Sequence, residues 1–273
     1  MIRKFRPEDL EECLMAMPIE NWKFVDEASY DESDQPFKPI MMISHLSELK
    51  GIEIGQRIKI KAFTHFDVIK SNALPKGFLD LVELMMINSK GAYKTIGCHL
   101  LEEKKAIYLL PYLSASDATI SAMSYMKERE VDFDAYTQNS IQSICRYDEI
   151  LYEISFNNVS FDINIFDTIS CELENETLLF SYYLGADVSE KGIENIVFSI
   201  MLSSGNVLRC SNFERVLSGH SWNFDDYLKQ ELKKLFYRKI DERGKTKYGS
   251  KELEIVFDCL IWSTINKMKE RYA

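Results

Sequence analysis

The sequence predicts an α+β protein: a mixed N-terminal module, a largely antiparallel C-terminal sheet and two C-terminal amphipathic helices that cover it. Three observations support this class. Helix and strand patterns alternate before residue 134, and short β-branched or aromatic segments separated by turn residues follow residue 149. Two helical patterns then end the chain. Hydrophobic residues make up 46% of the 273 residues, which is enough to build packed cores.

The first elements are predicted from spacing. Residues 7–17 place a proline in a first helical turn, acidic residues near the positive end of the helix dipole and apolar residues at helical intervals, so we expect a helix. Residues 57–63 alternate apolar and polar side chains, which predicts a strand with one solvated face. We expect a helix at 77–86, a hairpin from 93–101 and 106–113, and a further helix from Ser114 or Ser116 to Met126.

The C-terminal half resembles an antiparallel meander in its spacing. Six short segments lie between turn-forming residues, at 151–156, 160–166, 169–173, 177–184, 195–202 and 207–216. A sheet of this kind needs cover on one face, and the two helical patterns that follow supply it. The first helix carries Leu228, Leu232, Leu235 and Phe236 on one side. We therefore predict two domains, 1–140 and 141–273, with a single continuous domain left open.

Charge is distributed unevenly along the chain. Residues 229–251 contain nine basic and three acidic residues, a net charge of +6, whereas the whole chain carries −10. The remainder therefore carries −16, and polarised charge of this kind points to binding partners. The predicted partner-binding residues are Lys229, Lys233, Lys234, Arg238, Arg243, Lys245 and Lys247.

An acidic segment provides a counter-surface for these cations. It holds Asp26, Glu27, Asp31, Glu32 and Asp34. Contact between this segment of one copy and the basic helix of another would give a self-associating scaffold or homo-oligomer. The alternatives are an acidic surface of another protein or a nucleic acid, whose phosphates bind exposed cations.

A divergent Mg²⁺-dependent nuclease is the catalytic alternative. Such an enzyme needs carboxylates that hold the metal on a sheet, and Asp162, Glu172 and Glu174 are the candidates. The lysine that usually completes such a site is replaced here by Glu174. Magnesium is expected only under this alternative, and otherwise we expect no cofactor and no metal.

Standard motifs give no other function. The 11 glycines form neither a dinucleotide fingerprint nor a P-loop, and the six cysteines lie singly, as reduced core thiols do. We expect no signal peptide, no membrane partner and a cytoplasmic location, because acidic residues follow the basic N-terminus and apolar runs are short. The sequence therefore predicts a non-catalytic cytoplasmic interaction or assembly protein that binds an acidic partner through its basic C-terminal helical segment.

Overall fold

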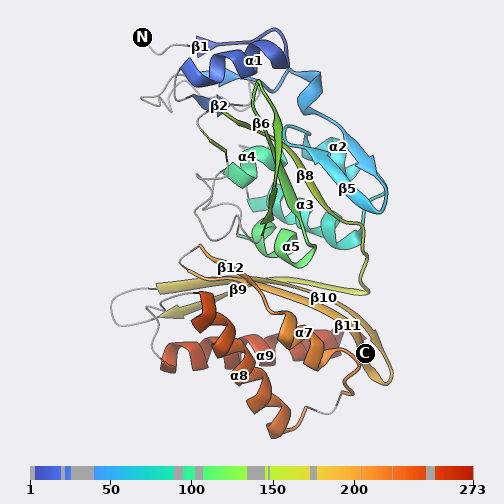
Figure 1. Cartoon of the computed structure of the whole chain (residues 1–273). Helices are drawn as coiled ribbons and strands as arrows, with labels where there is room; N and C mark the ends of the chain where they lie inside the picture. Colours follow the sequence, from blue (N-terminus) through green and yellow to red (C-terminus); the bar gives the residue numbers. More distant parts are fainter. Residues whose placement is uncertain are drawn as a thin grey trace. The chain divides into compact units, whose positions relative to one another are not determined.

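The chain folds into two compact units that each contain β-sheet (Figure 1). The computed structural model describes residues 4–19, 22–25, 40–88, 95–101, 107–133, 145–146, 148–172, 177–203, 205–222, 224–243 and 250–272. It confirms the α+β class with largely antiparallel sheets. Unit 1 comprises Met1–Ala106 and Asp117–Val159, and unit 2 comprises Ile107–Ser116 and Ser160–Ala273.

Unit 1 includes strand β8 (Ile150–Asn157) and therefore extends to Val159 in the sequence. The strand follows the domain boundary predicted at residue 140, yet it pairs with two strands of unit 1. Residues 107–116 in turn belong to unit 2, so the chain passes between the units more than once. The predicted division into domains 1–140 and 141–273 stays a prediction.

Unit 1 begins with a small parallel sheet. Its strand order is β1 (Lys4–Phe5), β3 (Ile40–Met42) and β2 (Lys23–Val25). Helix α1 (Leu10–Ala16) and the short helix η1 (Met17–Ile19) lie between β1 and β2 in the sequence. The helix predicted at 7–17 is confirmed, and it begins after Asp9 because this side chain accepts a hydrogen bond from the Glu12 amide at 2.8 Å.

The larger sheet of unit 1 is antiparallel. Its strands lie in the order β4 (Ile52–Ile54), β5 (Arg57–Lys61), β8, β6 (Thr119–Met123) and β7 (Glu128–Asp132). The strand expected at 57–63 is confirmed as β5. The helix expected up to Met126 is wrong, because Ile120 and Ala122 are buried while their neighbours face the other side, which is the period of a strand.

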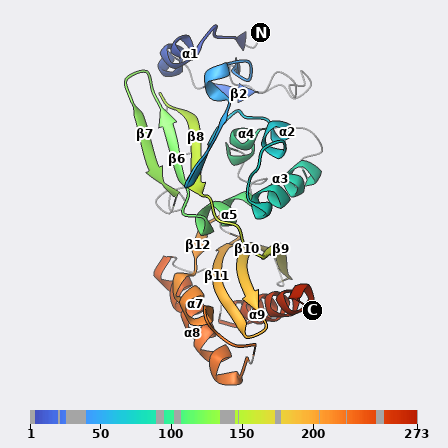
Figure 2. The same ribbon diagram turned by 90° about the vertical axis from the view of Figure 1, so that its right-hand side faces the viewer.

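Three helices cover one face of this sheet (Figure 2). They are α2 (Phe66–Lys70), α3 (Lys76–Asn88) and α4 (Ile96–Leu101), and the turn η2 (Ser47–Leu49) precedes β4. The ring of Phe78 on α3 packs on Phe156 of β8 with centroids 4.7 Å apart. The hairpin predicted at 93–101 and 106–113 is wrong, because these segments form α4 and α5 (Leu109–Ala115). All residues of α5 are buried, and apolar runs of this length do not distinguish strand from helix.

Unit 2 is built on a four-stranded antiparallel sheet. Its order is β12 (Val207–Arg209), β11 (Gly192–Met201), β10 (Thr177–Ser189) and β9 (Ile163–Glu172). The meander of six strands was therefore overpredicted. The segments at 160–166 and 169–173 form one strand, and residues after 210 form helix α7 (Ser211–Leu217) rather than a strand.

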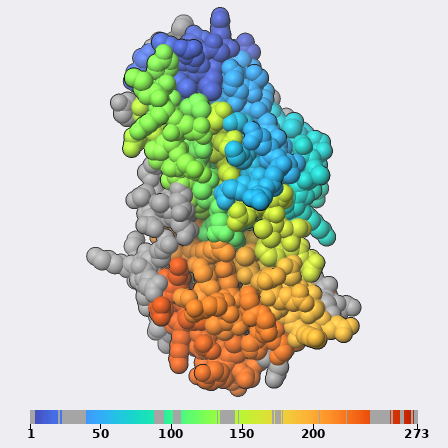
Figure 3. Space-filling view, turned by 45° about the vertical axis from the view of Figure 1, so that its right-hand side comes forward, coloured from blue at the N-terminus to red at the C-terminus, as the bar shows by residue number. Residues whose placement is uncertain are grey.

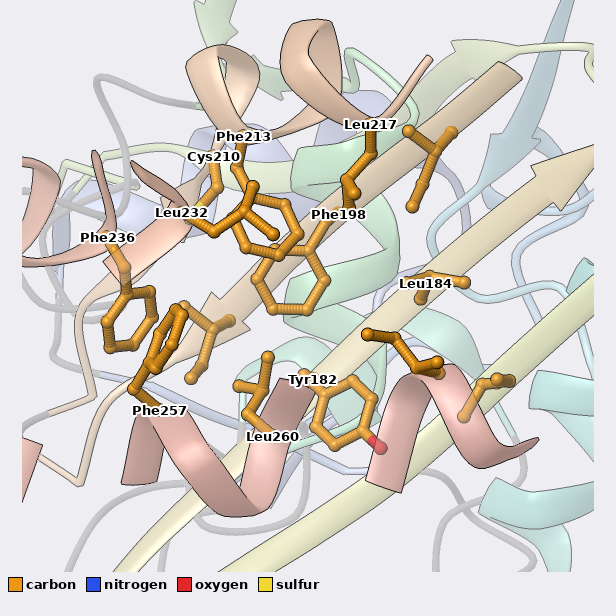
Figure 4. Packing of buried hydrophobic residues seen from close by; sticks show 14 of the residues in the cluster. Tyr182, Leu184, Phe198, Cys210, Phe213, Leu217, Leu232, Phe236, Phe257 and Leu260 are labelled. Carbon is orange, nitrogen blue, oxygen red and sulfur yellow. The ribbon is translucent and has the colours of Figure 1, made fainter. Parts of the chain in front are cut away.

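Helices cover both faces of this sheet. Helices α7, α8 (Asp226–Arg243) and α9 (Ser250–Tyr272) lie on one face, which confirms that the two predicted C-terminal helices close the sheet. Leu232 and Phe236 of α8 meet Phe257 and Leu260 of α9 in the core (Figure 4). Helix α5 packs on the opposite face, so unit 2 has three layers.

Candidate functional site

A row of cations lies along β5, on the face of the sheet opposite the core. Arg57, Lys59 and Lys61 alternate with the buried Ile58 and Ile60, because successive side chains of a strand point to opposite faces. The guanidinium of Arg57 donates to the Ser155 hydroxyl at 2.9 Å and to the Asn157 side-chain oxygen at 3.0 Å. It therefore ties β5 to β8.

Lys61 forms the most enclosed contact of this row. Its Nζ lies 3.1 Å from Oε2 of Glu153, which faces it on β8, and 3.5 Å from the centre of the Tyr152 ring. The two charged side chains are 19% and 11% exposed, against 47% and 72% for the neighbouring pair Lys59 and Glu53. Burial alone would lower the pKa of Lys61, but the hydrogen bonds with Tyr152 and Glu153 raise it above its ordinary value. The contacts with Tyr152 and Glu153 thus favour the protonated form of Lys61.

A second charged cluster joins β7 to the start of β8. The Glu149 carboxylate accepts hydrogen bonds from Arg129 and from the backbone amide of Arg146. Burial would raise the pKa of Glu149, but these donors hold it below its ordinary value. Sequence patterns missed both clusters, since only the strand register brings their members together.

The predicted basic surface on α8 is partly occupied within the chain. Lys229 lies 3.4 Å from Asp226 one turn earlier, and Lys233 forms an ion pair with Glu254 of α9. Lys234 and Arg238 are exposed, and Arg243 is the last residue of α8. Lys245 and Lys247 lie outside the described residues, as do Asp26, Glu27, Asp31, Glu32 and Asp34 of the acidic counter-surface.

The nuclease site does not form. Asp162 immediately precedes β9, whereas Glu172 is its last residue, so ten steps of about 3.3 Å along the strand separate their backbone positions. Metals of a two-metal site lie only about 4 Å apart. Glu174 lies outside the described residues. Within the described ranges there is no group of three or more His, Cys, Asp or Glu side chains arranged to hold a metal ion.

Cys13, Cys98, Cys145, Cys210 and Cys259 are free thiols. Cys13 and Cys210 are buried, and burial raises the pKa of each thiol to about 12. These two agree with the core thiols predicted from the sequence. Cys259 is exposed, so it departs from that prediction.

The start of α4 is a place where an anion could bind, since phosphates bind at helix starts and at close backbone approaches. Three of the amides in its first turn, those of Gly97, Cys98 and His99, are already used within the chain. The Gly97 amide donates to the Ala62 carbonyl at 2.7 Å, the Cys98 amide to Thr95 Oγ1 at 3.3 Å and the His99 amide to the Thr95 carbonyl at 3.2 Å. A Cβ on Gly97 would lie 2.6 Å from the Ala62 oxygen, so packing explains this glycine.

The carboxyl end of the small parallel sheet is the second place where ligands usually bind. Nε2 of His45 lies 2.7 Å from the Pro7 carbonyl oxygen there. The nearby Glu48 carboxylate has a lowered pKa, first because backbone and Ser47 hydrogen bonds stabilise its charge. A negative group at this position disfavours a phosphate. In the described part of the chain no helix has both the length and the apolarity to cross a bilayer.

Comparison with known proteins identifies the fold. No protein-family model and no curated protein sequence matches the chain. A carbon monoxide dehydrogenase of Hydrogenophaga pseudoflava that lacks the Mo-pyranopterin moiety of its molybdenum cofactor matches with a TM-score of 0.68 and 14% identity, over 94% of this chain and 93% of that chain. Reconstituted CO dehydrogenase from Oligotropha carboxidovorans gives 0.69 and 12%, over 95% of each chain.

A quinoline 2-oxidoreductase from Pseudomonas putida 86 has the same fold, with a TM-score of 0.66 and 11% identity over 86% of this chain and 85% of that chain. These likenesses contradict the function predicted from charge. The similar chains belong to oxidoreductases. The predictions of a non-catalytic interaction protein, of a self-associating scaffold and of a nuclease are therefore wrong. The predictions of an acidic protein or nucleic acid as the partner, and of no cofactor, are wrong for the same reason. The distribution of charged residues along the sequence shows where cations are concentrated, but it does not determine which reaction a fold supports.

Proposed function

We propose that this chain is a subunit of a multi-subunit oxidoreductase, where it assembles with other redox subunits. One observation carries the proposal. The likeness to carbon monoxide dehydrogenases extends over 94% and 95% of this chain and over 93% and 95% of the matched chains, so both units have counterparts there. Because fold alone does not fix function, the role of this chain is the proposal that the purification below tests.

A subunit of this kind works beside a redox cofactor, and FAD is the cofactor that we propose to test. The described residues do not fit its diphosphate, because the amides at the start of α4 are already used and Glu48 places a negative charge near the parallel sheet. We therefore derive no electron-transfer step through FAD and propose only that this chain is one subunit of such an oxidoreductase. We also propose a cytoplasmic location, since five of the cysteines, among them the buried Cys13 and Cys210, are free thiols.

Affinity purification tests the role. The chain, tagged and expressed at its natural level, is purified under gentle conditions from the cells that make it, with the tag alone as control. We expect oxidoreductase subunits in stoichiometric amounts, identified by mass spectrometry, together with a flavin in the visible spectrum of the complex. Recovery of the chain alone, or with proteins that have no redox function, would overturn the proposal.

A further inference from the structure

We propose that Arg57 closes a clamp on two of the passages of the chain between unit 1 and unit 2, so that the two passages act as a single hinge. The clamp is independent of the proposed function, because all the residues that form it belong to unit 1. It gives the chain a built-in limit on the relative movement of its two units.

The chain passes between the units after Ala106, after Ser116 and after Val159. Ala106 lies outside the described residues, whereas both sides of the other two passages are described. Asp117 leads into β6, and Val159 follows β8, which pairs with β6 in an antiparallel ladder. Because β6 begins where β8 ends, these two passages leave unit 1 at the same end of its larger sheet.

The Arg57 guanidinium reaches both passages. Its Nη1 donates to Oδ1 of Asn157 at 3.0 Å, and its Nη2 donates to the carbonyl oxygen of Asp117 at 3.0 Å. Nδ2 of Asn157 donates to Oδ2 of Asp117 at 3.1 Å, which closes a ring of hydrogen bonds among the three residues. A planar guanidinium with five donors in a fixed fork can hold acceptors from several segments in one geometry.

The backbone of Asp117 shows how the first of these passages is shaped. Its φ is +50°, in the left-handed region, which aspartate tolerates better than most residues. It directly follows Ser116, whose amide still donates to the Tyr112 carbonyl at the end of α5 at 3.0 Å. Asp117 is exposed, so packing contributes little to this turn, and the hydrogen bonds of the clamp fix it.

The second passage is tied down up to Asn158. The amide of Asn158 donates to the Gln56 carbonyl at 3.0 Å, and its side chain donates to the Gly55 carbonyl at 2.9 Å. The next residue, Val159, is 48% exposed, and the yellow-green segment that follows β8 is visible at the surface in Figure 3. The part of this passage that can turn therefore begins at Val159.

A hinge needs a few residues that absorb changes in backbone angles, next to segments that stay fixed. The clamp supplies the fixed segments, since it joins Asp117 to Asn157. With the clamp closed, both passages turn about a common origin. Without Arg57, the start of β6 and the end of β8 separate more readily, and the two units sample a wider range of relative positions.

Pulsed electron paramagnetic resonance on the full chain measures this range. The spin labels are attached through unnatural amino acids in place of Ile87 of α3 and Tyr227 of α8, which are 75% and 77% exposed. Arg57→Met removes the donors, and Arg57→Lys keeps the charge but loses the fork. Lys59→Met is the matched control, because it removes an exposed cation from the same face of β5. Circular dichroism and the thermal unfolding midpoint establish that each variant is folded.

We expect the distribution of distances between the labels to become at least about twofold wider in both Arg57 variants and to stay unchanged in Lys59→Met. Hydrogen exchange in residues 116–119 and 157–160 should become at least about tenfold faster in the same two variants. A role of Arg57 in strand pairing alone would speed exchange in β5 and leave the distance distribution as it is. Equal widths in wild type and in the folded Arg57→Met variant would therefore overturn the clamp, whatever the purification shows about the proposed function.

Discussion

Glu149 accepts hydrogen bonds from two nitrogens of Arg129, from Nε at 3.0 Å and from Nη2 at 2.6 Å. The carboxylate is 2% exposed and the guanidinium 27%. The Arg146 amide donates to the same carboxylate at 2.9 Å. A buried carboxylate with three hydrogen-bond donors is stable in its charged form. Through Arg129 it links the first residues of β7 to the residue that precedes β8.

Replacement of this carboxylate should destabilise the protein. We expect Glu149→Gln to lower the free energy of unfolding by about 2 kcal/mol, because hydrogen bonds to a charged group are lost and Arg129 keeps its charge beside a neutral amide. Urea denaturation measures this change. Glu83→Gln is the control, since Glu83 is 57% exposed in its pair with Lys70 and should cost less than about 1 kcal/mol. Equal losses in the two variants would contradict this account of Glu149.

The same residue predicts a dependence on pH. The native pKa of Glu149 lies below its ordinary value of 4.5, so the folded state favours the charged form. This contribution to stability is present above that ordinary value and disappears as the pH falls through the lower native pKa. The difference in unfolding free energy between wild type and Glu149→Gln should therefore shrink on acidification. A difference that stays constant down to the acid transition would show that the carboxylate charge is not involved.

Gly97 should tolerate no side chain. A Cβ there would lie 2.6 Å from the Ala62 carbonyl oxygen and 2.9 Å from its Cβ, so β5 and α4 would have to separate. We expect Gly97→Ala to cost about 1–3 kcal/mol in unfolding free energy and to lower the thermal midpoint. Gly55→Ala is the matched control, because its nearest contact is at 3.7 Å. An unchanged midpoint for Gly97→Ala would mean that the close approach is absent in solution.

The fold class could be predicted because it depends on local patterns. Leu228, Leu232 and Phe236 recur at helical spacing and are buried as expected, and Ile58 and Ile60 alternate on β5. Helices α4 and α5 could not be predicted, because they are short and buried on most sides. Their apolar runs therefore lack the polar face that marks an amphipathic helix.

The charged clusters could not be predicted for another reason. Lys61 and Glu153 are far apart in the sequence, and only the register between β5 and β8 makes them neighbours. Strand β7 could not be predicted either, because the segment from Glu128 to Asp132 is mostly charged and lacks the apolar alternation of a strand.

Two cross-strand ion pairs on β5 should differ in strength. Lys61 with Glu153 is shielded and Lys59 with Glu53 is exposed, although both face each other across antiparallel strands. Double-mutant cycles with Lys→Met and Glu→Gln should give a coupling free energy of about 1–3 kcal/mol for the inner pair and below about 1 kcal/mol for the outer pair.

The inner coupling should also depend on alkaline pH. The pKa of Lys61 is raised above 10.5, so its contribution is complete below that ordinary value and disappears as the pH rises through the higher native pKa. Urea denaturation at several pH values measures both effects. Similar coupling free energies for the two pairs would indicate that the shielding of Lys61 contributes nothing.

The adjacent Tyr182 and Tyr183 of β10 should respond in opposite ways to the loss of their hydroxyl groups. Their side chains lie on opposite faces of the sheet, with Tyr182 in the core under α9 and Tyr183 beside Tyr112 of α5 (Figure 4 shows Tyr182). The Tyr183 hydroxyl donates to Asn164 Oδ1 at 2.8 Å. The Tyr182 hydroxyl is buried and, among the described residues, has no hydrogen-bond partner.

We therefore expect Tyr183→Phe to lower the unfolding free energy by about 1 kcal/mol, because it leaves the Asn164 oxygen without its donor. Tyr182→Phe should be neutral or stabilising, since it removes an unpaired polar atom from an apolar core at almost constant volume. Urea unfolding of the two single variants is the measurement, and each serves as the control for the other. A larger loss of unfolding free energy for Tyr182→Phe than for Tyr183→Phe would contradict this prediction. It would show that the Tyr182 hydroxyl has a hydrogen-bond partner in solution.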